Sequence, residues 1–136
     1  YRMDPPDLVV LSACFSGMGD IRQGNGIVGL QTAFKVQGAR VMLLSIWEAD
    51  DFASLILMDR FYDNLSSMPA GQALRDAQHY LRTVTIGELG CAGWFDERRF
   101  RRIGLVAEDM RKISRLKPTH RPFAQIRYWG GYILYE

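Results

Sequence analysis

Two uninterrupted apolar stretches constrain the fold of this chain more than any other feature. They are LVVLS at residues 8–12 and RVMLLSIW at residues 40–47. Neither stretch alternates apolar with polar residues, which is the pattern of a strand that is covered on both faces, as in a parallel sheet between helices. We therefore predict two central strands of an α/β domain.

Three segments around these strands have the pattern of helices. Residues 27–38 place apolar side chains at helical spacing and end at Gly38, a residue that suits a helix C-terminus. Residues 49–65 predict a second helix, for which Asp50 is a natural N-cap. Residues 70–84 predict a third, with an apolar stripe formed by Ala70, Ala73, Leu74, Ala77, Leu81 and Val84.

The rest of the chain predicts fewer elements. Residues 94–116 are expected to be mostly helical, and residues 127–135 are expected to form a last strand. Three strands are few for a sheet whose first two members have no polar face. We therefore expect residues 1–136 to be the C-terminal portion of one larger domain, with further strands upstream.

Composition excludes several classes of protein. Apolar residues make up 48% of the chain, enough for a packed core, and the net charge is only +2, which does not indicate a strong polyanion binder. No segment is long and apolar enough to cross a membrane, and no signal peptide is visible. The two cysteines, Cys14 and Cys91, form no disulfide framework. A cytoplasmic location is the simplest expectation, and nothing indicates a metal ion or a cofactor.

Cys14 follows the first predicted strand and has two interpretations. The carboxyl end of a central parallel strand is where α/β sheets present ligands, and the small residues Ala13, Gly17 and Gly19 leave room around the thiol. Cys14 is then a candidate nucleophile. The alternative is an inert thiol that fills space, since free cysteine is among the most buried residue types.

The glycines at positions 24, 26 and 29 match the spacing G-x-G-x-x-G of dinucleotide sites. Glu48 lies about where the ribose-binding carboxylate of such a site is expected. In those sites, however, the glycines follow the strand directly, whereas about a dozen residues intervene here. We therefore favour glycines that shape a loop, and keep a nucleotide site as an alternative.

The ordered motifs of the chain resemble the CHAT family, the caspase-like domains usually found with TPR repeats. The similar pieces are LVVLSACFSG, GNGIVGLQTAF, GARVMLLSIWEADD, LMDRFYDNL, ALRDAQHYL and RPFAQIRYWGGYILY. They cover roughly residues 7–89 and 121–135, and they explain the glycine motif without a nucleotide.

This resemblance implies a caspase-haemoglobinase-like three-layer sandwich, of which the chain would hold the C-terminal part of the sheet with its helices. It also implies a cysteine endopeptidase with a Cys-His dyad, in which Cys14 attacks a peptide carbonyl and a backbone N–H holds the oxyanion. For Asp50 a plain helix cap is the competing interpretation. The positions that the resemblance associates with the substrate are Ser16, Gly17, Trp47, Glu48 and Asp50.

The catalytic histidine of the family is expected upstream of the cysteine, yet none of the thirteen residues before Cys14 is a histidine. His79 lies off the apolar stripe of its predicted helix, and His120 lies in a loop between prolines; we expect both at the surface. A thiol near the reference pKa of about 8.5 is mostly protonated at neutral pH. We therefore expect this chain alone to be inactive, and expect an upstream segment or another chain to supply the base.

Positive charge gathers in the last third of the chain. Residues 86–136 hold ten Lys and Arg against six Asp and Glu, whereas residues 1–85 hold seven against nine. We expect a helical insertion at about residues 90–117. A second hypothesis is a non-catalytic interaction module on the same scaffold, which docks a partner through residues 94–117. The expected partners are a protein or peptide substrate and a TPR or regulatory domain, but not nucleic acid.

Overall fold

The computed structural model describes residues 7–11, 25–46, 50–100 and 107–136. The chain divides into two compact units. The first consists of residues 1–48 with 131–136, and the second consists of residues 49–130. The predicted residues Cys14, Ser16, Gly17, Trp47 and Glu48 lie outside the described residues.

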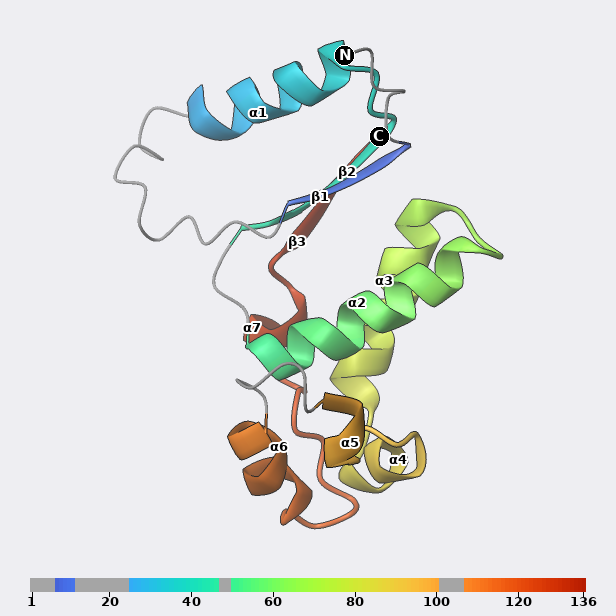
Figure 1. Ribbon diagram of the computed structural model, residues 1–136, viewed down its shortest axis with the longest axis vertical. Coiled ribbons are helices and arrows are strands. Elements are labelled where there is room, and N and C mark those ends of the chain that lie inside the picture. The colour runs from blue at the N-terminus through green and yellow to red at the C-terminus, as the bar shows by residue number, and fades with distance from the viewer. Residues whose placement is uncertain (1–6, 12–24, 47–49, 101–106) are drawn as a thin grey trace. The chain divides into compact units, whose positions relative to one another are not determined.

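The first unit holds a mixed sheet of three strands in the order β1-β2-β3 (Figure 1). Strand β1 (Leu8–Leu11) is parallel to β2 (Val41–Ser45), and β3 (Tyr132–Tyr135) is antiparallel to β2. Residue Leu43 pairs with Val10 on one side and with Leu134 on the other. The two apolar stretches of the sequence are thus neighbouring parallel strands, as an α/β domain requires.

Strand β2 is buried on both faces. Met42, Leu43 and Leu44 are each 1% exposed, and successive side chains of a strand point to opposite faces. This confirms the prediction made from the missing alternation. All four residues of β1 are half-buried, and among the described residues β1 pairs with β2 alone.

Helix α1 (Asn25–Val36) begins two residues earlier than the sequence predicted. Gly26 therefore lies in the helix rather than in the preceding loop, and Gly29 is exposed in the same helix, while Gly24 lies outside the described residues. The predicted C-terminal glycine is confirmed: Gly38 has φ 91° and its N–H donates to the carbonyl of Lys35. The N–H of Ala39 reaches the carbonyl of Phe34, which completes a Schellman motif, so this position needs a glycine.

The second unit is built on two helices that pack side by side, α2 (Asp51–Leu65) and α3 (Ala70–Thr83) (Figure 1). Both were predicted, with boundaries correct to within two residues. The predicted stripe of α3 is buried at Ala73, Leu74, Ala77, Leu81 and the following Val84, while Ala70 is half-buried. Hydrogen bonds also connect the two helices: Arg60 Nε and Asn64 Nδ2 of α2 donate to Asp76 Oδ2 of α3 at 2.9 and 2.8 Å.

An aromatic cluster forms the core near the start of α2. The ring of Phe52, which is fully buried, lies 6.3 Å from Trp94, 6.3 Å from Phe95 and 5.9 Å from Phe123. Two of these pairs are edge-to-face, the arrangement that aromatic quadrupoles favour. The cluster fixes the segment around Phe123 against α2.

Between α3 and this segment lie three short helices, α4 (Ile86–Cys91), α5 (Glu97–Phe100) and α6 (Ala107–Ser114). Of the predicted helical segment 94–116, the described residues 97–100 and 107–114 are helical, whereas α4 was not predicted. Thr85 caps the start of α4: its Oγ1 accepts from the N–H of Glu88 at 3.3 Å and donates to Glu88 Oε1 at 3.0 Å.

The predicted last strand, residues 127–135, is wrong in its first part. Residues Ile126–Trp129 form the short helix α7, and strand pairing begins only at Tyr132. Tertiary contacts override the strand propensity of Tyr128 and Trp129: Gln78 Nε2 donates to the carbonyl of Trp129 at 2.9 Å, and the guanidinium of Arg82 lies 5.4 Å from the Trp129 ring.

Within the described part of the chain, no helix combines the length and hydropathy that a membrane span requires. The same residues contain no group of three or more side chains that could hold a metal ion.

Candidate functional site

The sheet topology assigns a common edge to two of the predicted site segments. Because β1 and β2 are parallel neighbours, the chain leaves both at the same edge. Cys14 follows Leu11 of β1 by three residues, and Trp47 follows Ser45 of β2 by two residues. The carboxyl edge of such a sheet is where α/β folds bind ligands.

Asp50 is the one predicted site residue that the structure describes, and it acts as the N-cap of α2. Its Oδ1 accepts a hydrogen bond from the N–H of Ala53 at 2.9 Å. This bond satisfies one of the free amides at the helix start, and a carboxylate there also opposes the positive end of the helix dipole. The cap role is therefore confirmed, and one carboxylate oxygen is committed to it.

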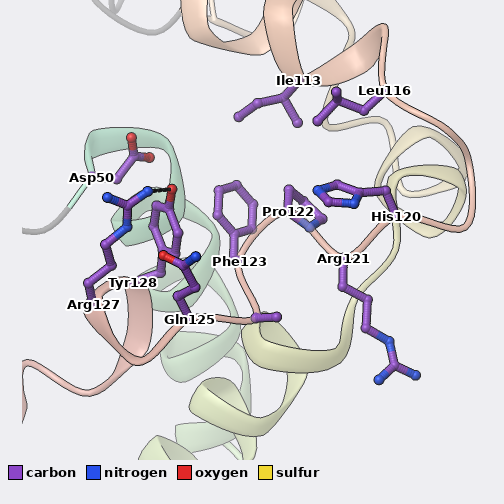
Figure 2. Close-up of a pocket in the computed structure, with 11 residues that line it drawn as sticks. Asp50, Ile113, Leu116, His120, Arg121, Pro122, Phe123, Gln125, Arg127 and Tyr128 are labelled. Atoms are coloured by element: carbon purple, nitrogen blue, oxygen red, sulfur yellow. Dashed lines mark hydrogen bonds between the residues drawn. The ribbon is translucent and has the colours of Figure 1, made fainter.

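Beside Asp50, the second unit contains a hollow of about 450 Å³. Figure 2 shows its walls: Ile113 and Leu116 extend from α6 and the following turn toward Pro122 and Phe123 on the facing segment. On one wall, Phe123 is 1% exposed and packs in the aromatic cluster; on the opposite wall, the Leu116 side chain is 44% exposed. The middle of the hollow is therefore apolar.

Polar and cationic groups surround this apolar middle. His120 and Arg121 line it on one side, and Arg127 and Tyr128 on the other (Figure 2). Arg127 Nη2 donates to Tyr128 Oη at 2.6 Å, and its guanidinium lies 4.6 Å from the Tyr128 ring centroid. The Tyr128 ring in turn packs edge-on against Phe123, at 5.3 Å between centroids. Arg127 is thereby held in place at the rim.

Comparison with known protein families decides the affiliation of the chain. The model of the CHAT domain matches residues 2–136. The chain belongs to the CHAT domain family. This is a family of caspase-like peptidases, and the resemblance of the individual motifs is confirmed. The search of curated proteins and the search of solved structures returned no match.

Both histidines of this CHAT domain lie at the protein surface, as predicted. His79 is exposed on α3, and its Nδ1 lies 3.2 Å from Nη2 of Arg82. His120 is exposed at the rim of the hollow. Its backbone is fixed, since its carbonyl accepts from the N–H of Ile86 at 2.9 Å.

Sequence reasoning did not find the hollow. The sequence singled out the basic helical segment 94–117, whereas the hollow also uses residues 120–128, for which it predicted a loop at His120 and the beginning of the last strand at residue 127. One signal was present: from residue 111 to residue 127 the chain has six Lys and Arg but no Asp or Glu. The apolar side chains that meet there come from residues up to eleven positions apart, Ile113 to Ala124, so only the fold brings them together.

Proposed function

We propose that this CHAT domain is the nucleophile-bearing part of a caspase-like cysteine endopeptidase, with Cys14 as the nucleophile. The observation that supports this most is membership of the CHAT family. The position of Cys14 agrees with it, because Cys14 follows by three residues the strand β1, which pairs in parallel with β2. In this proposal the domain has the three-layer architecture of caspases, and strands outside the described residues join the half-buried edge of β1.

The chemistry requires a base that neither His79 nor His120 is proposed to provide. An upstream segment or another chain supplies an imidazole, which takes the proton of the Cys14 thiol. The thiolate forms a bond to the peptide carbonyl carbon, and backbone N–H groups hold the resulting oxyanion. The imidazolium then protonates the leaving amine as the C–N bond breaks. Water, deprotonated by the same imidazole, releases the acyl group and restores the thiol.

The test compares the two cysteines of the chain. Cys91 is a free, exposed thiol and is therefore a matched control for general thiol reactivity. In the protein that carries this chain, a biotinylated peptide acyloxymethyl ketone is expected to label the domain through Cys14. Labelling is expected to be lost in Cys14→Ala and kept in Cys91→Ala. Equal labelling of the parent and Cys14→Ala would contradict the proposal and favour the interaction module.

Asp50 is proposed to contribute to the substrate cleft in addition to its cap role, and two variants separate these contributions. Asp50→Ser keeps an oxygen that accepts from Ala53 N–H, so we expect it to change the unfolding free energy by less than about 0.5 kcal/mol, whereas Asp50→Ala costs about 0.5–2 kcal/mol. An increased KM in Asp50→Ser at unchanged stability supports substrate contact. An unchanged KM in both variants limits Asp50 to capping.

A further inference from the structure

The chain around the hollow carries cations that nothing in the described structure neutralises. Arg111 pairs with Glu97 at 2.8 Å, and Lys112 pairs with Glu108 at 3.1 Å. Arg115, Lys117 and Arg121 are exposed, and none of them forms an ion pair or side-chain hydrogen bond with the described residues. This surface is therefore positive after its internal pairs are taken into account.

Two of these cations, Lys117 and Arg121, lie beside the exposed side chain of Leu116. A second, more open hollow of about 610 Å³ is lined by Lys117 and Thr119 and shares Leu116, His120 and Arg121 with the first. We call the two together the basic groove, defined by Ile113, Leu116, Lys117, His120, Arg121 and Phe123. Among the described residues that line the two hollows, Asp50 alone has a carboxylate; it lies at the α2 end of the first hollow, and its Oδ1 accepts from the N–H of Ala53.

We propose that the basic groove binds an acidic segment of a partner protein. An apolar side chain of that segment enters the hollow between Leu116 and Phe123, and its carboxylates lie beside Lys117 and Arg121. Charge complementarity is the main argument, since opposite potentials across an interface direct association and select the partner. The proposal does not depend on peptidase activity, because the groove lies wholly in residues 49–130.

The apolar middle favours a peptide over a nucleic acid. Single-stranded nucleic acids bind through phosphate contacts combined with exposed aromatic rings on which bases stack. Here Phe123 is 1% exposed and Tyr128 is half-buried, with its ring covered by the Arg127 guanidinium. An aliphatic side chain fits such a hollow, whereas the buried Phe123 ring and the Arg127-covered Tyr128 ring offer a base little surface, and the exposed His120 imidazole is the one remaining aromatic ring among the described lining residues.

The probe is a short fluorescein-labelled peptide that has glutamates on both sides of a central leucine, and binding to the full chain is followed by fluorescence anisotropy. We expect the dissociation constant to increase at least about tenfold between roughly 50 and 300 mM salt, because exposed charges are screened. The same peptide with glutamines in place of the glutamates is expected to bind at least about tenfold more weakly.

Variants of the groove separate local contacts from net charge. Arg121→Glu, Lys117→Glu and Leu116→Asp each change an exposed side chain, and each is expected to weaken binding at least about threefold. The matched control is Arg75→Glu, at an exposed arginine of α3 that lines neither hollow. It makes the same change in net charge as Arg121→Glu and Lys117→Glu and is expected to leave binding unchanged. Circular dichroism verifies that each variant is folded.

Three outcomes would overturn the proposal. Equal binding of the glutamine peptide would show that carboxylates are not recognised. An equal loss in Arg75→Glu would show that only the net charge of the chain matters. Tighter binding of a labelled single-stranded oligonucleotide, lost in the groove variants, would assign the groove to nucleic acid instead.

Discussion

Replacing Phe52 with leucine tests whether the aromatic cluster stabilises the second unit beyond simple burial. Phe52 lies within 6.3 Å, ring to ring, of Trp94, Phe95 and Phe123. Each such pair contributes about 0.5–1.5 kcal/mol beyond the area it buries. The matched control is Phe61→Leu, because Phe61 is equally buried in the same helix but has one ring neighbour, at 5.8 Å.

The two substitutions make the same change of side chain at fully buried positions of one helix, so the loss of volume and hydrophobicity is matched in the comparison. The difference of two or more ring pairs then predicts that Phe52→Leu lowers the free energy of unfolding by about 1–3 kcal/mol more than Phe61→Leu. Urea denaturation followed by far-ultraviolet circular dichroism measures both values. A cost for Phe61→Leu that equals or exceeds that of Phe52→Leu would refute the reasoning.

Two further predictions concern polar contacts in the same unit. Asp76→Asn is expected to cost at most about 1 kcal/mol at neutral pH, because the carboxylate is 38% exposed. The hydrogen bonds from Asn64 and Arg60 lower the pKa of Asp76 in the folded protein. The carboxylate therefore contributes fully to the free energy of unfolding above the unfolded pKa of about 3.9, and this contribution is lost as the pH falls through the folded pKa. Urea denaturation at a series of decreasing pH values measures the loss. Thr85→Ala removes the cap of α4 and is expected to cost about 0.5–2 kcal/mol in thermal denaturation. Thr85→Ser keeps the hydroxyl, and a loss as large as that of Thr85→Ala would contradict the role of the cap.

The elements predicted correctly are those whose local pattern and tertiary environment agree. The run of Met42, Leu43 and Leu44 predicts burial on both faces, and β2 is the middle strand of the described sheet. Asp50 caps α2 and Gly38 ends the turn after α1 because both roles depend on bonds to residues within five positions. Hydrogen bonds between residues so close in the sequence can be predicted from the local sequence alone.

The sequence-based predictions fail where contacts with residues far away in the sequence determine the local structure. The segment Arg127–Trp129 has strand propensity, but Gln78, 51 positions away, holds it as part of α7. Helix α4 has two glycines among its six residues, and its position depends on bonds from Ile86 to His120 and from Gly87 to Pro118. The basic groove arises in the same way, since its apolar wall depends on Phe123 packing against Phe52.

The pairing of β2 with β3 has a consequence for synthesis on the ribosome. Leu43 pairs with Leu134 of the antiparallel strand β3, so one side of β2 stays without hydrogen bonds until about ninety further residues have been translated. During that interval a bare apolar edge is open to pairing with other nascent chains. A chain that is truncated before Tyr132 would therefore keep this edge of β2 unpaired, and we expect such a product to aggregate.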